Sequence, residues 1–218
     1  MKSIKKFLDR IFIDGLSAMA QGLFATLIIG TIIQQIGTFV GGEIGNLIFL
    51  VGKVAASLTG AGIGVAVAAK FEKPMLVVIS TASAGMVGAF ASSLLSGKIL
   101  TEGTIILAGP GEPLGAFIAA YVGLVVGGLI AGKTKVDIII TPIVTIASGA
   151  TVGLLLGPGI SGFMAWLGSL INWGTEQQPL LMGIIVSVLM GMILTLPISS
   201  AAIGIILNLS GLAAGAAT

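Results

Sequence analysis

The feature that most constrains this chain is a succession of long apolar segments separated by short connections. A helix needs about 20 mostly apolar residues to cross a hydrocarbon core about 30 Å thick. Only 8% of the 218 residues are charged and 56% are hydrophobic, whereas a soluble domain carries about 25% charged residues. Since polar groups cannot cover the outside of such a chain, lipid must be its solvent. We predict an all-α fold, a polytopic bundle of transmembrane helices.

Six of these segments are predicted as spans of one transmembrane domain, residues 14–218. The predicted spans are 14–40, 45–69, 75–95, 116–131, 136–156 and 180–209. The motif GPG at 157–159 is expected to end the fifth span. Residues 160–173 are too short to cross the bilayer and are therefore predicted to form an interfacial or re-entrant piece.

The residues before the first span combine basic and apolar side chains at helical spacing. This pattern predicts an amphipathic helix over residues 1–13 that lies on an anionic membrane surface. A solvated helix start is the alternative interpretation.

The charges on the connections predict how the chain is oriented. The basic residues are Lys2, Lys5, Lys6 and Arg10 before the first span, Lys70 and Lys73 after the second, and Lys133 and Lys135 after the fourth. The connections between them carry Glu43, then Lys98 with Glu102, then Glu176. Cytoplasmic loops are enriched in Lys and Arg, so we expect the amino terminus on the cytoplasmic side.

Glycines recur at a spacing of four residues, which places them on one face of a helix. Gly149, Gly153 and Gly157 are the longest such series, and Gly123 with Gly127 is another. Small residues on one face allow the backbones of neighbouring helices to approach closely. We therefore predict packed helices rather than isolated ones.

The stretch ILAGPGEPLGAF, residues 106–117, is the strongest candidate for a binding site. Its glycines and prolines oppose regular helix although both flanks are apolar. Irregular backbone beside transmembrane segments is tolerated where it is buried in protein or lines a wet cavity. Glu112, between Gly111 and Pro113, adds a carboxylate that can accept hydrogen bonds from hydroxyl groups. The alternative interpretation is an extracellular turn.

Two further positions are candidates for solute binding. In TLPISS, Pro197 frees a backbone carbonyl beside the hydroxyls of Thr195, Ser199 and Ser200, and broken helices of this kind form the central sites of many transporters; a simple kink is the alternative. Lys53 lies between long apolar runs, where an ionisable group is costly and hence a functional candidate. Its alternative is a side chain that extends to the membrane surface.

Other kinds of chemistry have no pattern in this sequence. Histidine and cysteine are both absent, which removes the commonest general base and the commonest metal ligands. We predict no catalytic residue, no metal and no cofactor. A net charge of +2 is too small to suggest a nucleic-acid partner.

The runs KVDIIITPIVTIASGATVGLLLGPGI, residues 135–160, and LTLPISSAAIGIILNLSGLAAGAAT, residues 194–218, resemble the membrane component (EIIC) of bacterial phosphotransferase-system sugar transporters. The branch they resemble is the PfoR-type, or putative toxin-regulator, branch. GPGEPLGAF at 109–117 is similar to the Gly-x-Thr-Glu-Pro stretch of sugar-binding members. That similarity implies that Glu112 contacts the sugar, although Gly111 stands where the family has Thr and the stretch lies in the first half of this chain.

The resemblance implies a multi-pass protein of the bacterial inner membrane that is embedded in lipid, forms a homodimer and translocates a sugar. The phosphate would come from a separate IIB partner, so this chain is at most a IIC subunit that is not itself phosphorylated. Family members are longer and have more spans, and a truncated form of that fold is one reading of the present length.

Three functions remain open at this point. The first is a permease of the IIC type for a small polar solute. The second is a membrane regulator or sensor that keeps the permease fold without coupled transport. The third is a facilitator or channel that works without phosphorylation.

Overall fold

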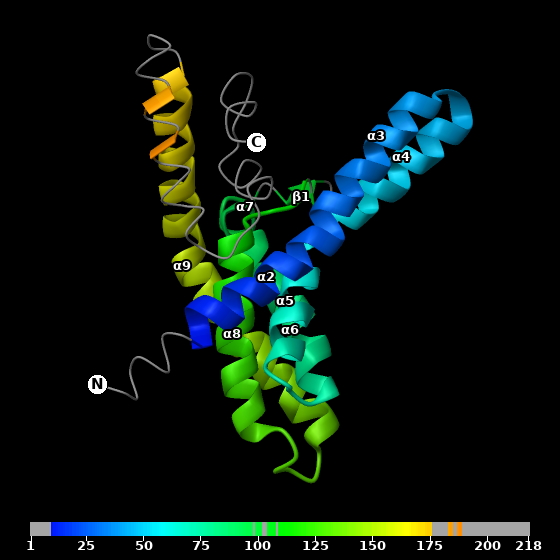
Figure 1. The fold of residues 1–218 in the computed structure, drawn as a ribbon. Coiled ribbons are helices and arrows are strands. Elements are labelled where there is room, and N and C mark those ends of the chain that lie inside the picture. The colour runs from blue at the N-terminus through cyan, green and yellow to red at the C-terminus, as the bar shows by residue number, and fades with distance from the viewer. Residues whose placement is uncertain are drawn as a thin grey trace.

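The computed structural model of the chain describes residues 10–97, 99–101, 104–107, 109–175, 183–184 and 187–188. Helices account for almost all of them, and one short two-stranded hairpin is present (Figure 1). The all-α class is confirmed for this part of the chain.

The chain begins with one helix that runs from Arg10 to Val40. Two π-helical stretches interrupt its α-helical hydrogen bonding, so its parts are η1 (Arg10–Gly15), α2 (Leu16–Leu23), η2 (Phe24–Ile28) and α3 (Ile29–Val40). The predicted span 14–40 lies within this helix. Of the predicted interfacial helix 1–13, the last four residues form its start, and the first nine lie outside the described residues.

The second span is bent rather than straight. Helix α4 (Gly42–Ser57) and helix α5 (Thr59–Lys70) meet at Leu58 with an angle of 51°. Helices α3 and α4 pack against each other as a hairpin, which projects away from the other helices (Figure 1). We call this hairpin, residues 29–57, the α3–α4 arm.

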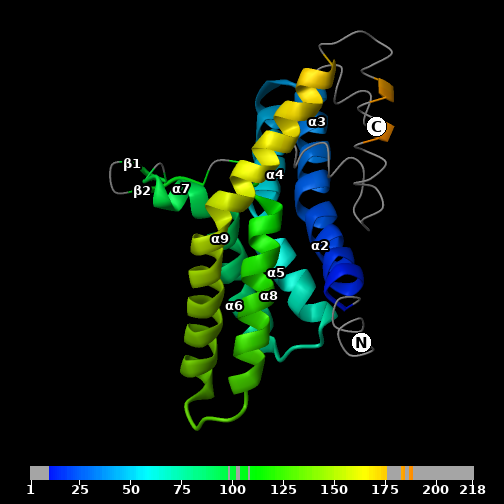
Figure 2. The ribbon, with the colours of Figure 1, turned by 90° about the vertical axis from the view of Figure 1, so that its left-hand side faces the viewer.

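The remaining helices form the bundle. Helices α2 and α5 pack with α6 (Met75–Ala89), α8 (Pro113–Ile130) and α9 (Asp137–Thr175), as Figure 2 shows from a second side. The predicted span 75–95 is broken at Phe90, after which the chain forms the short helix α7 (Ala91–Leu95). Strands β1 (Leu100–Thr101) and β2 (Thr104–Ile105) pair antiparallel between α7 and α8.

Close backbone contacts hold the bundle together, as the glycine spacing predicted. A Cβ atom on Gly149 would lie 2.6 Å from the carbonyl oxygen of Ala119, and one on Gly153 would lie 3.0 Å from the Cα of Gly88. Only glycine allows α9 to approach α8 and α6 so closely. Because lipid tails are as apolar as the helices, van der Waals contact rather than removal from water stabilises this packing.

Helix α9 continues through residues 157–159, where the sequence predicted a break. It has 39 residues and contains both Pro142 and Pro158. A proline removes one backbone donor and kinks a helix without necessarily ending it. The upper part of α9 leans away from the line of its lower part in Figure 2. Residues 160–173 are therefore a continuation of this helix and not a separate piece.

Three described helices are long and apolar enough to cross a membrane, namely Arg10–Val40, Pro113–Ile130 and Asp137–Ser169, and the bent pair α4–α5 is a fourth if it counts as one span. Helix α6 is apolar but shorter. These helices support a polytopic membrane bundle with broken helices. The predicted span 180–209 lies almost entirely outside the described residues, so the total of six spans remains a prediction.

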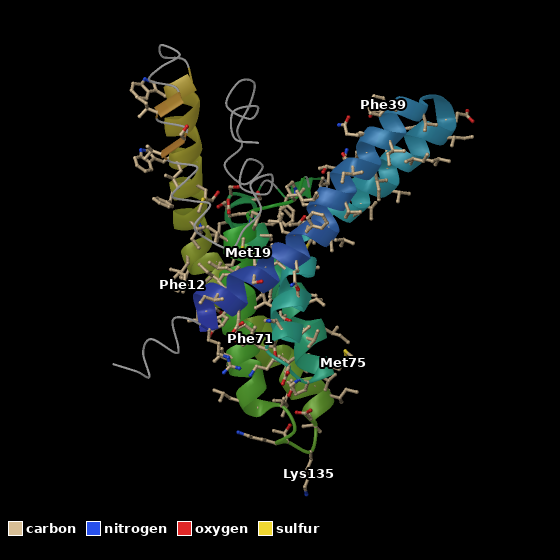
Figure 3. All side chains as sticks on the ribbon, viewed as in Figure 1. Phe12, Met19, Phe39, Phe71, Met75 and Lys135 are labelled. Carbon is tan, nitrogen blue, oxygen red and sulfur yellow. The ribbon has the colours of Figure 1, made fainter. Side chains whose placement is uncertain are left out.

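The basic connections gather at one end of the bundle. Figure 3 shows Lys135, in the connection between α8 and α9, at the end of the molecule near which α6 begins with Met75. Nearby, Arg10 lies over the ring of Phe71 at 5.0 Å, and Lys70 Nζ lies 3.8 Å from Asp14 Oδ1. This gathering is what the positive-inside rule requires of one membrane face, and assigning that face to the cytoplasm remains a prediction.

Candidate solute-binding site

The predicted irregular backbone before α8 is confirmed. Gly109 and Gly111 have φ angles of +80° and +73°, a region that favours glycine because it has no side chain. Glu112 is extended (φ −96°, ψ 107°) and is the N-cap of α8, and Pro113 is the first residue of the helix. Proline fits this position because its missing N–H would have no helical partner.

A backbone contact ties this turn to the end of α6. The N–H of Glu112 donates a 2.7 Å hydrogen bond to the carbonyl oxygen of Ala89. A Cβ atom on Gly111 would lie 2.8 Å from that same oxygen. Because α6 stops at Phe90, its last carbonyls need donors from elsewhere, and the turn supplies one. The start of α8 and the break between α6 and α7 therefore form one unit.

A cavity of about 210 Å³ lies at this unit. Helices α6, α7 and α9 and the turn before α8 all contribute to its wall. The lining residues are Gly88, Ala89, Phe90, Ser92, Ser93, Gly111, Glu112, Gly157 and Ser161. Apart from Phe90, the wall consists of small residues, three hydroxyls and one carboxyl group.

Glu112 is the one ionisable residue among the described residues that line this cavity. Its Oε1 accepts a 3.3 Å hydrogen bond from the backbone N–H of Leu114. Burial raises the pKa of the Glu112 carboxyl from 4.5 to about 7, and the hydrogen bond from Leu114 opposes that rise only in part. The residue precedes the span Pro113–Ile130 and lies outside it.

This arrangement can bind a small polar molecule. The carboxyl oxygens of Glu112 can accept hydrogen bonds, while Ser92, Ser93 and Ser161 can both donate and accept. Pockets for drug-sized ligands are larger, about 300–1,000 Å³, so this cavity suits a compact solute. No basic side chain is among its described lining residues, which makes it unsuited to an anion.

The structure brings together only some of the residues that the sequence singled out. Glu112 and Gly111 line the cavity, whereas Pro113 is buried in the first turn of α8 beside it. Lys53 is exposed on α4 and does not line the cavity. Thr195, Ser199 and Ser200 lie outside the described residues.

Three hydroxyl residues of the cavity were not predicted. Ser92 and Ser93 fall within the predicted span 75–95, but the helix breaks at Phe90 and both side chains line the cavity. Ser161 was missed because the chain was expected to leave its helix at residues 157–159. The one sequence feature that could have indicated these polar lining residues is the pair of adjacent serines near the end of an apolar segment.

A second polar pocket lies at the other end of the bundle, where α5 ends. Arg10, Asp14, Lys70, Phe71 and Glu72 line about 300 Å³. The side chains of Lys70 and Asp14 are about half exposed (47% and 49%), and exposed ion pairs contribute little to stability. The contacts here join the start of the first helix to the connection between α5 and α6.

Comparison with known proteins supports the same class of protein. Residues 13–218, nearly the whole chain, match the family described as "Phosphotransferase system, EIIC". No curated protein and no solved structure matches the chain. With its apolar helices and its broken-helix cavity, this chain belongs to the phosphotransferase-system EIIC family and is a membrane permease component of that type.

Proposed function

We propose that the chain binds a sugar in the cavity around Glu112 and translocates it across the bacterial inner membrane. The observation that carries this proposal is the position of Glu112, which caps α8 and presents a carboxyl group to a small cavity lined with hydroxyls. Sugars have many hydroxyl groups and no charge, which matches an acceptor accompanied by three serines. Broken helices around such a site are typical of transporters.

The phosphate would be handled by a separate protein. The 218 residues of the sequence contain no histidine and no cysteine, the residues that carry phosphate in IIB domains. This absence fits a separate IIB partner, which membership of the EIIC family suggests; such a partner would dock on the cytoplasmic face and phosphorylate the sugar as it leaves. A homodimer of the chain, surrounded by lipid, is the proposed assembly.

The experiment that tests the site is a binding measurement on the purified chain in detergent. A panel of neutral hexoses, hexitols and N-acetylhexosamines is added singly, and the shift in unfolding temperature is recorded, because a ligand that binds the native state stabilises it. The proposal predicts that at least one neutral sugar stabilises the wild type and that Glu112→Gln reduces that effect. If uronic acids or sugar phosphates stabilise the chain instead, the assignment of a neutral sugar is wrong.

A membrane regulator with the same fold is the second candidate, favoured by the resemblance to the PfoR-type branch. Such a protein would bind the sugar at Glu112 without moving it. Uptake of the stabilising sugar into vesicles, measured with and without a phosphorylated IIB protein, separates the two. Binding without uptake in either case favours the regulator, whereas uptake without IIB favours a facilitator. The hydroxyls of Thr195, Ser199 and Ser200 are proposed as further sugar contacts in either case.

A further inference from the structure

The α3–α4 arm contains one short pattern four times. An aliphatic residue, a glycine and a polar residue follow one another as IGT at 29–31 and 36–38, as IGN at 44–46 and as VGK at 51–53. Two copies lie in α3 and two in α4, with a spacing of seven residues within each helix. A seven-residue spacing corresponds to nearly two helical turns, so equivalent positions recur on one face.

All four glycines lie where the two helices touch. A Cβ atom on Gly30 would lie 2.7 Å from the nitrogen of Ala56, and one on Gly37 would lie 2.6 Å from the carbonyl oxygen of Gly45. A Cβ atom on Gly52 would lie 2.5 Å from the carbonyl oxygen of Gly30. These contacts pair the start of α3 with the end of α4, so the helices are antiparallel.

The residues that flank each glycine consequently lie on opposite sides of the arm. Each residue of an α-helix is rotated by about 100° from the one before it. In two antiparallel helices that face each other, the residues that follow the contact glycines turn to the same side of the pair. One side therefore carries Thr31, Thr38, Asn46 and Lys53, and the other carries Ile29, Ile36, Ile44 and Val51. Gln35 lies between Thr31 and Thr38 at helical spacing and joins the first side, and Leu50, which is 47% exposed, joins it in the same way between Asn46 and Lys53.

Neither side of the arm is covered by the described residues. Ile44 and Val51 are 69% and 60% exposed. On the polar side, Gln35, Asn46 and Lys53 are exposed, and among the residues that the structure describes their side chains have no hydrogen-bond or ion-pair partner.

The two sides require different surroundings. The aliphatic side is suited to lipid, but an ammonium and two amides that have no partner among the described residues are costly in hydrocarbon. A second copy on the polar side would meet it with the same face, because a two-fold interface is isologous, and would bring two Lys53 ammonium groups and no carboxylate into that interface. The one acidic residue on the arm, Glu43, is ten residues away, or about 15 Å along the helix. Water can satisfy all of these groups.

The arm leaves the bundle at the end where the Glu112 cavity lies. Just beyond the arm, a Cβ atom on Gly60 would lie 2.8 Å from the Cβ of Ala89, and Ala89 lines the cavity. We infer that the polar side of the α3–α4 arm lines a water-filled vestibule through which a neutral polyhydroxyl solute reaches the cavity, while the aliphatic side faces lipid. This inference rests on the proposed function of that cavity.

The test uses matched cysteine pairs, because the chain has no native cysteine. Thr38→Cys is compared with Ile36→Cys, and Lys53→Cys with Val51→Cys, in the full chain reconstituted into lipid vesicles. A charged methanethiosulfonate reagent needs water to reach and ionise the thiol. We expect each thiol on the polar side to react at least about tenfold faster than the paired thiol on the aliphatic side. Equal, slow rates at both members of each pair would mean that protein covers the polar side and would overturn the inference.

Solute uptake then decides whether the vestibule conducts. The charged adduct at Thr38→Cys should slow sugar uptake by at least about fivefold, whereas the same reagent on Ile36→Cys should leave it unchanged. Rapid labelling of the polar side with unchanged uptake would place the arm on the membrane surface and would overturn the inference. Sugar binding to the unlabelled proteins is measured in parallel, so that a failure of the Glu112 site is recognised separately.

Discussion

At the scale of single residues, Glu112 combines two roles. Its carboxyl group accepts a hydrogen bond from the first free N–H of α8 and faces a cavity lined by three serines. The first role needs only an oxygen atom, whereas binding of hydroxyl groups is strengthened by the charge. A substitution that keeps the shape and removes the charge separates the two.

Glu112→Gln should therefore bind the solute about 10- to 100-fold more weakly, because a hydrogen bond to a charged group contributes about 1.5–3 kcal/mol. Isothermal titration with the stabilising sugar measures the change. Glu72→Gln, at the opposite end of α6, is the matched control and should bind like the wild type. Normal binding by Glu112→Gln would remove the site assignment and the role inferred from the Gly-x-Thr-Glu-Pro resemblance.

Affinity should also depend on pH near neutrality. Burial raises the pKa of Glu112 to about 7, so the carboxyl is mostly protonated at pH 6 and mostly ionised at pH 8. If the carboxylate is the acceptor, affinity rises with pH through this range and gains about tenfold between pH 6 and pH 8. Glu112→Gln should give a flat profile. A wild-type affinity that falls as the pH rises would mean that the protonated carboxyl binds the solute by donating.

At the scale of helices, the site depends on α9 continuing past Pro158. Ser161 reaches the cavity only because it lies one turn beyond Gly157 on the same helix. The motif GPG predicts a break from the conformational preferences of its residues. Those preferences are local, and in this helix packing outweighs them, since a Cβ atom on Gly157 would come into contact with Ala91 of α7. Because Gly157 and Ala91 are far apart in the sequence, the local pattern does not predict that contact.

Ser161→Ala should weaken sugar binding about fivefold, because a neutral hydrogen bond contributes about 1 kcal/mol. Ser169→Ala, two turns further along α9 and exposed, is its control and should have no effect. The same titration measures both. Wild-type affinity in Ser161→Ala would show that the solute does not extend to α9.

The glycine contacts make a separate prediction about stability. Gly149→Ala places a methyl group 2.6 Å from the carbonyl oxygen of Ala119 and should lower the free energy of unfolding by about 1–3 kcal/mol. Gly162→Ala meets nothing within 4 Å and should stabilise the helix slightly, because alanine is the better helix former. Thermal unfolding in detergent compares them. Equal stability of the two variants would contradict the packing of α9 on α8.

At the scale of the whole molecule, composition and segment length were sufficient to predict a helical membrane bundle. The positions of the bends were harder to predict from the sequence. Phe90 has alanine on both sides rather than proline or glycine, and Leu58 follows an ordinary Ala-Ser pair. Both bends are favoured by packing between distant segments, as where Gly60 meets Gly85. The four triplets of the α3–α4 arm are visible in the sequence, but only the antiparallel pairing shows that they form two faces.

The alternation of charged connections predicts that Lys2, Lys70 and Lys133 face the cytoplasm and that Lys98 and Glu176 face outward. Single cysteines at these positions report the orientation through an impermeant thiol reagent. Positions 70 and 133 should remain unlabelled in intact cells and react after the cells are opened, whereas position 98 should react in both. Labelling of position 70 or 133 in intact cells would reverse the topology.

The length of α9 has a consequence for the lipid around the protein. Its apolar part, Asp137–Ser169, has 33 residues and is about 50 Å long, against a hydrocarbon thickness of about 30 Å. A straight helix of that length would need a tilt beyond the usual limit of about 40°. The part before Pro158 alone is about 30 Å long and matches the bilayer. We therefore expect bilayer thickness to act on the angle at Pro158. Because the cavity residues Gly157 and Ser161 lie on either side of that proline, lipids with longer or shorter acyl chains should change the shape of the cavity itself.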